Sequence, residues 1–175
     1  MTKTFKEAFI ILIISVILGL AANAISSKGI PLVRDDRERF VIDSTKKSVD
    51  LKVRGKLNKA GFYQPVNIPV EAAKQLFDEN VKFIDGRTAE EFKTGHIKGA
   101  INIPYIEFKD KSNEEKLEML KGFGKDDVIV SYCGSVECEI SIDNAYEIAK
   151  VGYNDMKIYL GGYKEWNNLG YPVEK

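Results

Sequence analysis

Cysteine is scarce in this sequence, and its scarcity excludes two common kinds of site. The 175 residues include only two cysteines, Cys133 and Cys138. Two cysteines cannot build a disulfide framework, and their separation differs from the Cys-x-x-Cys spacing of structural zinc sites. We therefore expect neither a disulfide scaffold nor a bound metal, and nothing else in the sequence indicates a cofactor.

A net positive charge is also absent, since Lys and Arg together balance Asp and Glu over the whole chain. Residues 34–59 carry nine basic against five acidic side chains, whereas residues 60–175 carry fourteen against twenty. A nucleic-acid-binding domain needs a basic folded face. The globular part is acidic instead, so we expect no nucleic-acid partner. There is no internal repeat and no low-complexity tract.

Charge of either sign is missing from residues 8–27, a run of twenty positions. A helix of roughly 20 apolar residues crosses about 30 Å of hydrocarbon. Ala22-Asn23-Ala24 also has the small-x-small form of a signal-peptidase site. We favour a retained single-pass membrane anchor over residues 1–27, with a cleaved signal peptide as the alternative.

The basic residues that flank this run favour opposite membrane orientations. Lys3 and Lys6 favour an N-terminus inside the cell, and the other flank favours the reverse through Lys28, Arg34, Arg37 and Arg39. Large trailing domains often cross the membrane regardless of such counts, so we favour an extracytoplasmic globular domain. Residues 28–62 are predicted to be a basic linker with short strands at 40–42 and 49–53, and residues 63–175 the folded domain.

From Asn67 onward, strand-like and helix-like segments alternate. The pattern predicts strands at residues 81–84, 100–103, 128–130 and 156–160. It predicts helices at residues 69–77, 89–94, 114–120 and 140–151, and one around Trp166. Such alternation implies right-handed crossovers and a parallel sheet that is covered on both faces. Ligands of these sheets bind at the carboxyl ends of the strands.

Cys133 is the best candidate for the chemistry, because it follows the β-branched run 128–130 and precedes the helix that starts at Ile140. The first turn of a helix has free N–H groups and a positive dipole end, which stabilise an anion such as a thiolate. We expect the intervening residues to form a substrate-binding loop. These are Gly134, Ser135, Val136, Glu137, Cys138 and Glu139.

Four separated motifs occur in the order found in one known family. They are Ile84-Asp-Gly-Arg87 with Glu90-Glu-Phe92, then Gly95-His-Ile-Lys-Gly-Ala-Ile-Asn-Ile-Pro104, Val130-Ser-Tyr-Cys133, and Gly161-Gly-Tyr-Lys-Glu-Trp166 with Gly170-Tyr-Pro172. Over about residues 67–174 the chain resembles the rhodanese family of sulfurtransferases. The N-terminal anchor is similar to that of membrane-tethered single-domain members.

The resemblance implies an α/β fold, a rhodanese-like three-layer sandwich with a central parallel sheet of about five strands. It implies that Cys133 accepts sulfane sulfur as a persulfide. The partners would then be a small sulfur donor and a thiol or other nucleophilic acceptor. His96, the single histidine, matches a structural residue of the family. Asp85 and Arg87 are expected to form a hydrogen-bonded pair at a strand end, with Arg87 also a candidate for positive potential near the pocket.

The loop departs from the family's usual pattern. Typical members carry a basic residue within it, but here it contains Glu137 and Glu139 and no cation. These carboxylates should raise the pKa of the thiol and repel an anionic donor, which disfavours thiosulfate as the natural substrate. Related cysteine phosphatases need an arginine six positions after the nucleophile. Glu139 occupies that position, which excludes a phosphatase.

Three functions remain open from the sequence. The first is sulfur transfer through Cys133, and the second is a redox pair in which Cys133 and Cys138 alternate between dithiol and disulfide. The third is a non-catalytic, membrane-tethered interaction domain. Loss of Cys133 would abolish the first two and leave the third intact.

Overall fold

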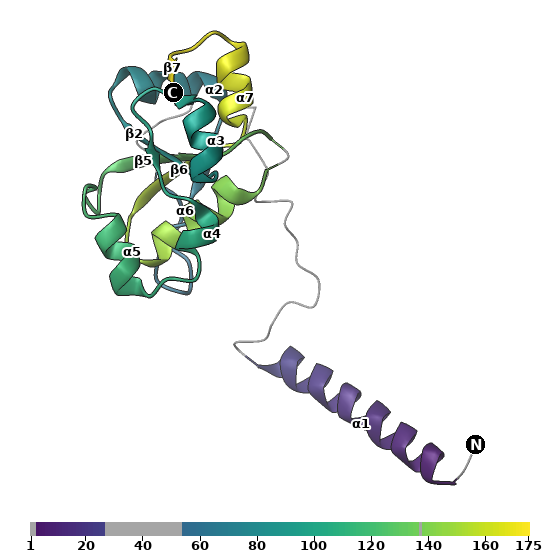
Figure 1. Cartoon of the computed structure of the whole chain (residues 1–175). Coiled ribbons are helices and arrows are strands. Elements are labelled where there is room, and N and C mark those ends of the chain that lie inside the picture. Colours follow the sequence, from purple (N-terminus) through teal and green to yellow (C-terminus); the bar gives the residue numbers. More distant parts are fainter. Residues whose placement is uncertain (1–2, 27–53, 137) are drawn as a thin grey trace. The chain divides into compact units, whose positions relative to one another are not determined.

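A computed structural model describes residues 3–26, 54–136 and 138–175 of the chain (Figure 1). The predicted strands at 40–42 and 49–53, most of the predicted linker, and the loop residue Glu137 lie outside the described residues. The chain divides into two units, residues 1–36 and 37–175. They are described separately below.

The described residues of the first unit, 3–26, form one long helix, α1 (Lys3–Ile25). Its stretch Phe5–Ile25 is 21 residues long and apolar enough to cross a membrane, and none of its side chains is buried. A helix that is apolar on all sides needs a nonpolar environment around it. The chain therefore begins with a helix that fits either a membrane anchor or a signal sequence.

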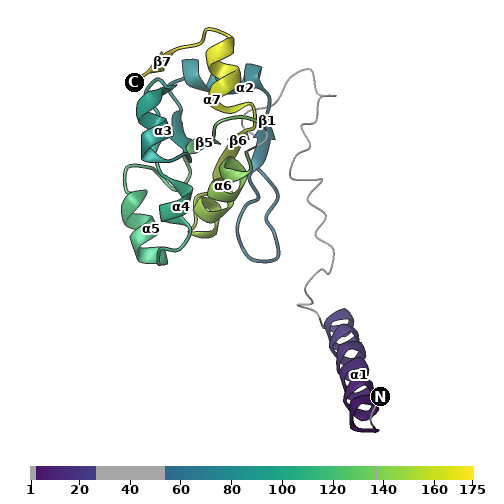
Figure 2. The ribbon, with the colours of Figure 1, turned by 45° about the vertical axis from the view of Figure 1, so that its right-hand side comes forward.

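The second unit is built on a five-stranded sheet in which every pairing is parallel (Figures 1 and 2). Its strands are β1 (Val66–Ile68), β2 (Lys82–Asp85), β4 (Ile101–Asn102), β5 (Val128–Tyr132) and β6 (Asp155–Tyr159). The order is β1-β6-β5-β2-β4, so β5 lies in the middle. This confirms the predicted α/β fold with a five-stranded parallel sheet.

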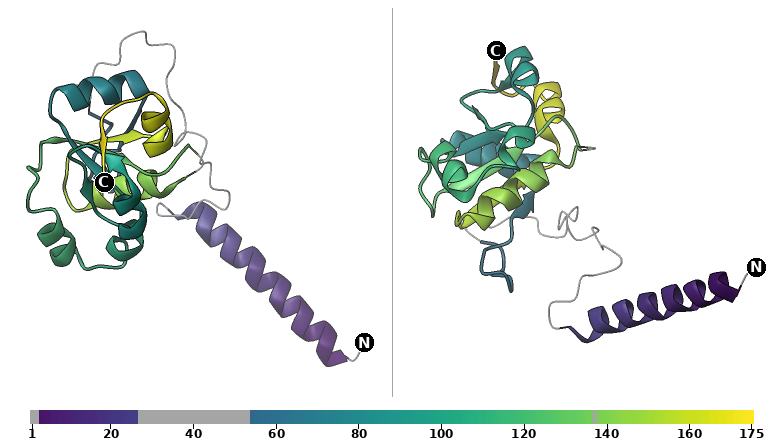
Figure 3. Two further views of the ribbon diagram at one scale, coloured as in Figure 1. Left: turned by 45° about the horizontal axis from the view of Figure 1, so that its top comes forward. Right: turned by 60° about the horizontal axis from the view of Figure 1, so that its bottom comes forward.

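Helices cover both faces of this sheet, as the views in Figure 3 show. On one face, α4 (Tyr105–Phe108) and α6 (Ile140–Lys150) contribute to the first apolar cluster, and α5 (Asn113–Met119) packs against it. On the other face, α2 (Val70–Asp78) and α7 (Gly162–Asn168) contribute to a second cluster. Side chains alternate along a strand, so Ile129 of β5 joins the first cluster and Val130 the second. This explains the continuous apolar run of β5.

A small antiparallel ribbon pairs β3 (His96–Ile97) with β7 (Val173–Glu174), next to α3 (Ala89–Thr94). The His96 ring stacks on Phe92, and its Nδ1 lies 2.9 Å from the Phe92 carbonyl oxygen. Its Nε2 lies 3.3 Å from the Glu174 carboxylate. These contacts join α3 to the C-terminal strand, which agrees with a structural place for His96.

Candidate functional site

Cys133 follows β5 directly and therefore lies at the carboxyl end of the middle strand. Its side chain is buried. The start of α7 fixes its backbone, because the Tyr163 N–H donates to the Cys133 carbonyl at 2.8 Å and the Lys164 N–H to the Gly134 carbonyl at 2.9 Å. The carbonyl groups of Cys133 and Gly134, at the start of the loop, are thus both hydrogen-bonded to α7.

Gly162 makes this attachment possible. Its φ is +63°, and a Cβ atom built there would lie 2.4 Å from the Cys133 carbonyl oxygen. Only glycine adopts this backbone at low cost while leaving room for that oxygen. In the sequence, Gly161-Gly162 stands out only as part of a motif, and nothing there shows that Gly162 is needed for its contact with Cys133.

Replacing Gly162 with alanine is expected to lower the free energy of unfolding more than the same change at Gly170. Both residues have positive φ, which costs an alanine about 1–2 kcal/mol. A Cβ at Gly170 would meet no atom within 4 Å, whereas at Gly162 it displaces Cys133, adding roughly 1–3 kcal/mol. Denaturant unfolding of the two variants measures the difference, and equal losses would contradict the assignment.

The sulfur of Cys133 is surrounded by polar groups from the loop and from α6. It lies 3.0 Å from the Cys138 carbonyl oxygen, 3.6 Å from the Ser135 carbonyl oxygen and 3.6 Å from the Ser141 hydroxyl. The backbone N–H of Ser141 also donates to it. Ser131 donates to the Ser141 carbonyl at 2.9 Å and so holds that residue in place. The first turn of α6 therefore presents two polar groups to the sulfur.

Ser141 is a site residue that the sequence analysis missed. It lies eight positions after Cys133, inside the predicted helix, and its side chain is fully buried. The available signal was a serine among the apolar residues that face the sheet. Periodicity alone treats such a serine as a packing residue.

The second cysteine contacts the first. Cys138 is half-buried, and its side chain forms a hydrogen bond with that of Cys133. The backbone N–H groups of Ile140 and Gly134 also donate to the Cys138 sulfur. The hydrogen bond from Cys133, followed by these N–H groups, lowers the pKa of Cys138 to about 6 although partial burial opposes the shift.

The hydrogen bond with Cys138, followed by burial, raises the pKa of the Cys133 thiol. A raised pKa was expected from the loop carboxylates, but its two largest causes are the hydrogen bond with Cys138 and burial. The same hydrogen bond thus shifts the pKa values of the two thiols in opposite directions and favours the thiolate on Cys138. The N–H groups at the start of α6 thus serve both sulfurs rather than Cys133 alone.

The described part of the loop turns back at Ser135. The Cys138 N–H donates to the Ser135 carbonyl at 3.0 Å, and Glu139 accepts hydrogen bonds from the first turn of α6 through its carbonyl. Ser135 and the exposed Val136 border a pocket of about 330 Å³ whose other wall is α7. The pocket lies directly beside the loop and is open to solvent.

Arg87 is buried beside the start of the loop. Its Nη2 lies 2.6 Å from the Asp85 carboxylate and donates to the Gly95 carbonyl at 2.8 Å, and its guanidinium lies 4.6 Å from the centre of the Tyr163 ring. A Cβ at Gly134 would lie 3.7 Å from the Arg87 Cδ. The predicted Asp85–Arg87 pair is confirmed. Asp85 neutralises the charge of the guanidinium. A contribution of Arg87 to the positive potential near the pocket stays a prediction.

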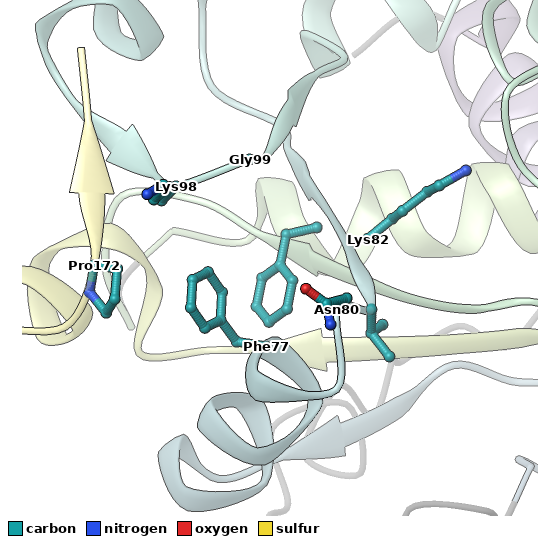
Figure 4. Close-up of a pocket in the computed structure, with 8 residues that line it drawn as sticks. Phe77, Asn80, Lys82, Lys98, Gly99 and Pro172 are labelled. Carbon is teal, nitrogen blue, oxygen red and sulfur yellow. The ribbon is translucent and has the colours of Figure 1, made fainter.

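A larger pocket of about 470 Å³ lies elsewhere and contains neither cysteine (Figure 4). Its lining includes Asn80, Lys82 and Phe83, at the beginning of β2. Lys82 pairs in register with Ile129, so this end of the sheet is opposite to that of Cys133. The described residues contain no cluster of three or more side chains suited to a metal ion.

Comparison with known proteins identifies the family. Residues 69–169 match the family model described as "Rhodanese-like domain", which is more than half of the chain. The chain belongs to the rhodanese-like family. The match runs from the residue before α2 to the end of α7 and so includes the whole loop after β5.

Several relatives of this rhodanese-like chain have names that describe an activity. "Thiosulfate sulfurtransferase 16, chloroplastic" of Arabidopsis thaliana is 32% identical over 114 residues, which cover 63% of this chain and 93% of that protein. "Thiosulfate sulfurtransferase 18" of the same plant is 30% identical over 115 residues, covering 62% and 82%. The crystal structure of the BH2092 protein from Bacillus halodurans agrees in fold, with a TM-score of 0.53 at 23% identity over 62% of this chain and 76% of that one.

Proposed function

We propose that this rhodanese-like domain is a sulfurtransferase that carries sulfane sulfur as a persulfide on Cys133. The observation that carries the proposal is the position of Cys133, at the carboxyl end of the middle strand and within hydrogen-bond reach of the first turn of α6. The names of the distant relatives agree with this activity.

The chemistry needs one nucleophile and a set of N–H donors. The Cys133 thiolate attacks the outer sulfur of the donor, the S–S bond of the donor breaks, and the remainder leaves as an anion. Cys133 then carries a persulfide, whose negative charge the N–H groups of the loop and of α6 stabilise. A thiol or other nucleophilic acceptor removes the outer sulfur and restores the Cys133 thiolate. The substrate-binding loop comprises Gly134, Ser135, Val136, Glu137, Cys138 and Glu139.

The contact between the sulfurs assigns a proton acceptor to the first step. Cys133 has a raised pKa, while Cys138 has a lowered one and hydrogen-bonds to it. When Cys133 attacks, its proton passes to the Cys138 sulfur across this hydrogen bond. Cys133 need not be ionised before the donor arrives.

The preferred donor is expected to be a persulfide or polysulfide rather than thiosulfate. No Lys or Arg lies between Gly134 and Glu139, so the loop itself offers a dianion two carboxylates and no cation. Replacing Glu137 with arginine should raise kcat/KM for thiosulfate by about tenfold and that for glutathione persulfide by less. Steady-state rates with both donors measure this.

The control is Glu114→Arg, which makes the same change of charge on α5, outside the loop. It should leave the ratio of the two kcat/KM values unchanged. Equal gains for both donors in Glu137→Arg would contradict the electrostatic explanation of the donor preference.

We also propose that α1 is retained as a single-pass anchor with the globular domain outside the cytoplasm. The uncharged run and the uniformly apolar helix support this. The full-length product should then sediment with membranes, keep its N-terminus at Met1, and be released by detergent but not by high salt. Recovery of the intact chain in the soluble fraction would contradict the anchor, and a mature N-terminus at Ile25 would establish a signal peptide instead.

A further inference from the structure

The loop places the sulfur of Cys138 next to the proposed reactive sulfur of Cys133. Cys133 and Cys138 are both free thiols, and their side chains are joined by a hydrogen bond. The turn from Ser135 to Cys138 brings them together, and the Cys133 sulfur lies 3.0 Å from the Cys138 carbonyl oxygen. The turn therefore places the second thiol beside the first.

The same N–H groups that would hold a persulfide now hold Cys138. The Gly134 and Ile140 N–H groups donate to its sulfur, and the Ser141 N–H donates to that of Cys133. Cys138 is also the more exposed of the two cysteines. With its pKa near 6, it is mostly a thiolate at neutral pH. The loop therefore places a second nucleophile, the Cys138 thiolate, beside the Cys133 sulfur that carries the sulfane sulfur.

We propose that Cys138 resolves the Cys133 persulfide by attacking the inner sulfur, so that hydrosulfide leaves and a Cys133–Cys138 disulfide remains. This inference rests on the proposed function. In the step, a bond forms between the two cysteine sulfurs, and the bond between Cys133 and the outer sulfur breaks. The proton that Cys138 accepted during loading passes to the outer sulfur, and the electron pair of the broken bond departs with that sulfur as HS⁻. No external oxidant is required, because the persulfide sulfur is itself reduced.

The direction of this step follows from leaving-group chemistry. In thiol–disulfide exchange, the sulfur of lower pKa leaves more readily. Hydrogen sulfide is a stronger acid than an alkyl thiol, so hydrosulfide is the better leaving group of the two sulfurs of the persulfide. A dithiol, or two thiols, must then reduce the disulfide before the next turnover. The net reaction converts the sulfane sulfur of a donor into hydrosulfide and the thiols into a disulfide.

The test compares the full-length protein with Cys138→Ser, Cys138→Ala and Cys133→Ser, each in detergent. Reduced protein, freed of reductant, receives one equivalent of glutathione persulfide and no acceptor, and is then quenched with an alkylating agent. The wild type should release hydrosulfide in proportion to the chains loaded and form the internal disulfide, seen as a loss of two hydrogen atoms in the peptide that spans both cysteines.

Both Cys138 variants should release hydrosulfide only at the level of a protein-free blank and accumulate one extra sulfur on Cys133. When an external thiol acceptor is added, they should still transfer that sulfur. Using two substitutions, with unfolding compared to the wild type, separates loss of the nucleophile from loss of the fold.

Undiminished hydrosulfide release by the Cys138 variants, or a persulfide on Cys138 without any disulfide in the wild type, would overturn the resolving step and leave the loading of Cys133 intact. Wild-type protein that neither gains sulfur on Cys133 nor releases hydrosulfide would instead overturn the proposed function itself.

Discussion

Replacing Cys133 with serine is expected to reduce sulfur transfer by at least about 1,000-fold, as removal of a catalytic nucleophile does in other enzymes. A serine hydroxyl in the same position keeps the hydrogen-bonding environment but cannot carry a sulfane sulfur. The initial rate of transfer from glutathione persulfide to an external thiol, measured at neutral pH, gives the comparison. Cys138→Ser is the matched control, because it makes the same replacement of sulfur by oxygen in the neighbouring side chain.

The control variant should retain transfer to the external thiol, although it loses the proton acceptor and slows. Equal loss in both variants would refute the ranking of the two cysteines and favour a redox pair as the main activity. Wild-type protein that transfers no sulfur from any persulfide or polysulfide would favour the non-catalytic interaction domain.

Replacing Asp85 with alanine is expected to lower the free energy of unfolding by about 3–5 kcal/mol. Asp85 is fully buried and accepts hydrogen bonds from the Arg87 side chain and from the Arg87 backbone N–H. Removing it leaves the arginine charge inside the domain without a partner, and that costs far more than the loss of an attractive contact at the surface. Denaturant unfolding at constant pH measures the change.

Asp78→Ala provides the contrast within the same chain. Asp78 pairs with Lys74 at 2.6 Å on one exposed face of α2, a geometry for which about 0–1 kcal/mol is typical. Two aspartate-to-alanine changes therefore differ in burial while sharing a similar ion-pair distance. A loss at Asp85 no larger than that at Asp78 would contradict the structural importance assigned to the Asp85–Arg87 pair.

The long elements were predictable because their signals are local. The β-branched run predicted β5, and helix α3 has the predicted bounds 89–94, where Thr88 and Glu91 form a capping box. Strand β1, helix α4 and the β3–β7 ribbon were not predicted. They contain two to four residues each, too few for a periodic pattern, and they form because neighbouring elements provide their partners.

The site divides in the same way. The position of Cys133 follows from the order of strand, loop and helix, and the Asp85–Arg87 pair follows from its place at a strand end. The contacts of Ser141 and Gly162 with Cys133 exist because α6 and α7 pack against the loop. Such tertiary contacts leave no local pattern in the sequence. The hydrogen bond between the two sulfurs depends on the curvature of the turn, and spacing alone left it open.

The most direct measurement of the central claim is the mass of the chain after incubation with a sulfur donor. Full-length protein carrying Cys138→Ser, which prevents resolution, is incubated with glutathione persulfide or thiosulfate and then digested for peptide mapping. We predict a gain of one sulfur atom on the peptide that contains Cys133, larger with the persulfide, and no gain when Cys133 is also serine. A gain of one sulfur that survives Cys133→Ser would contradict the account.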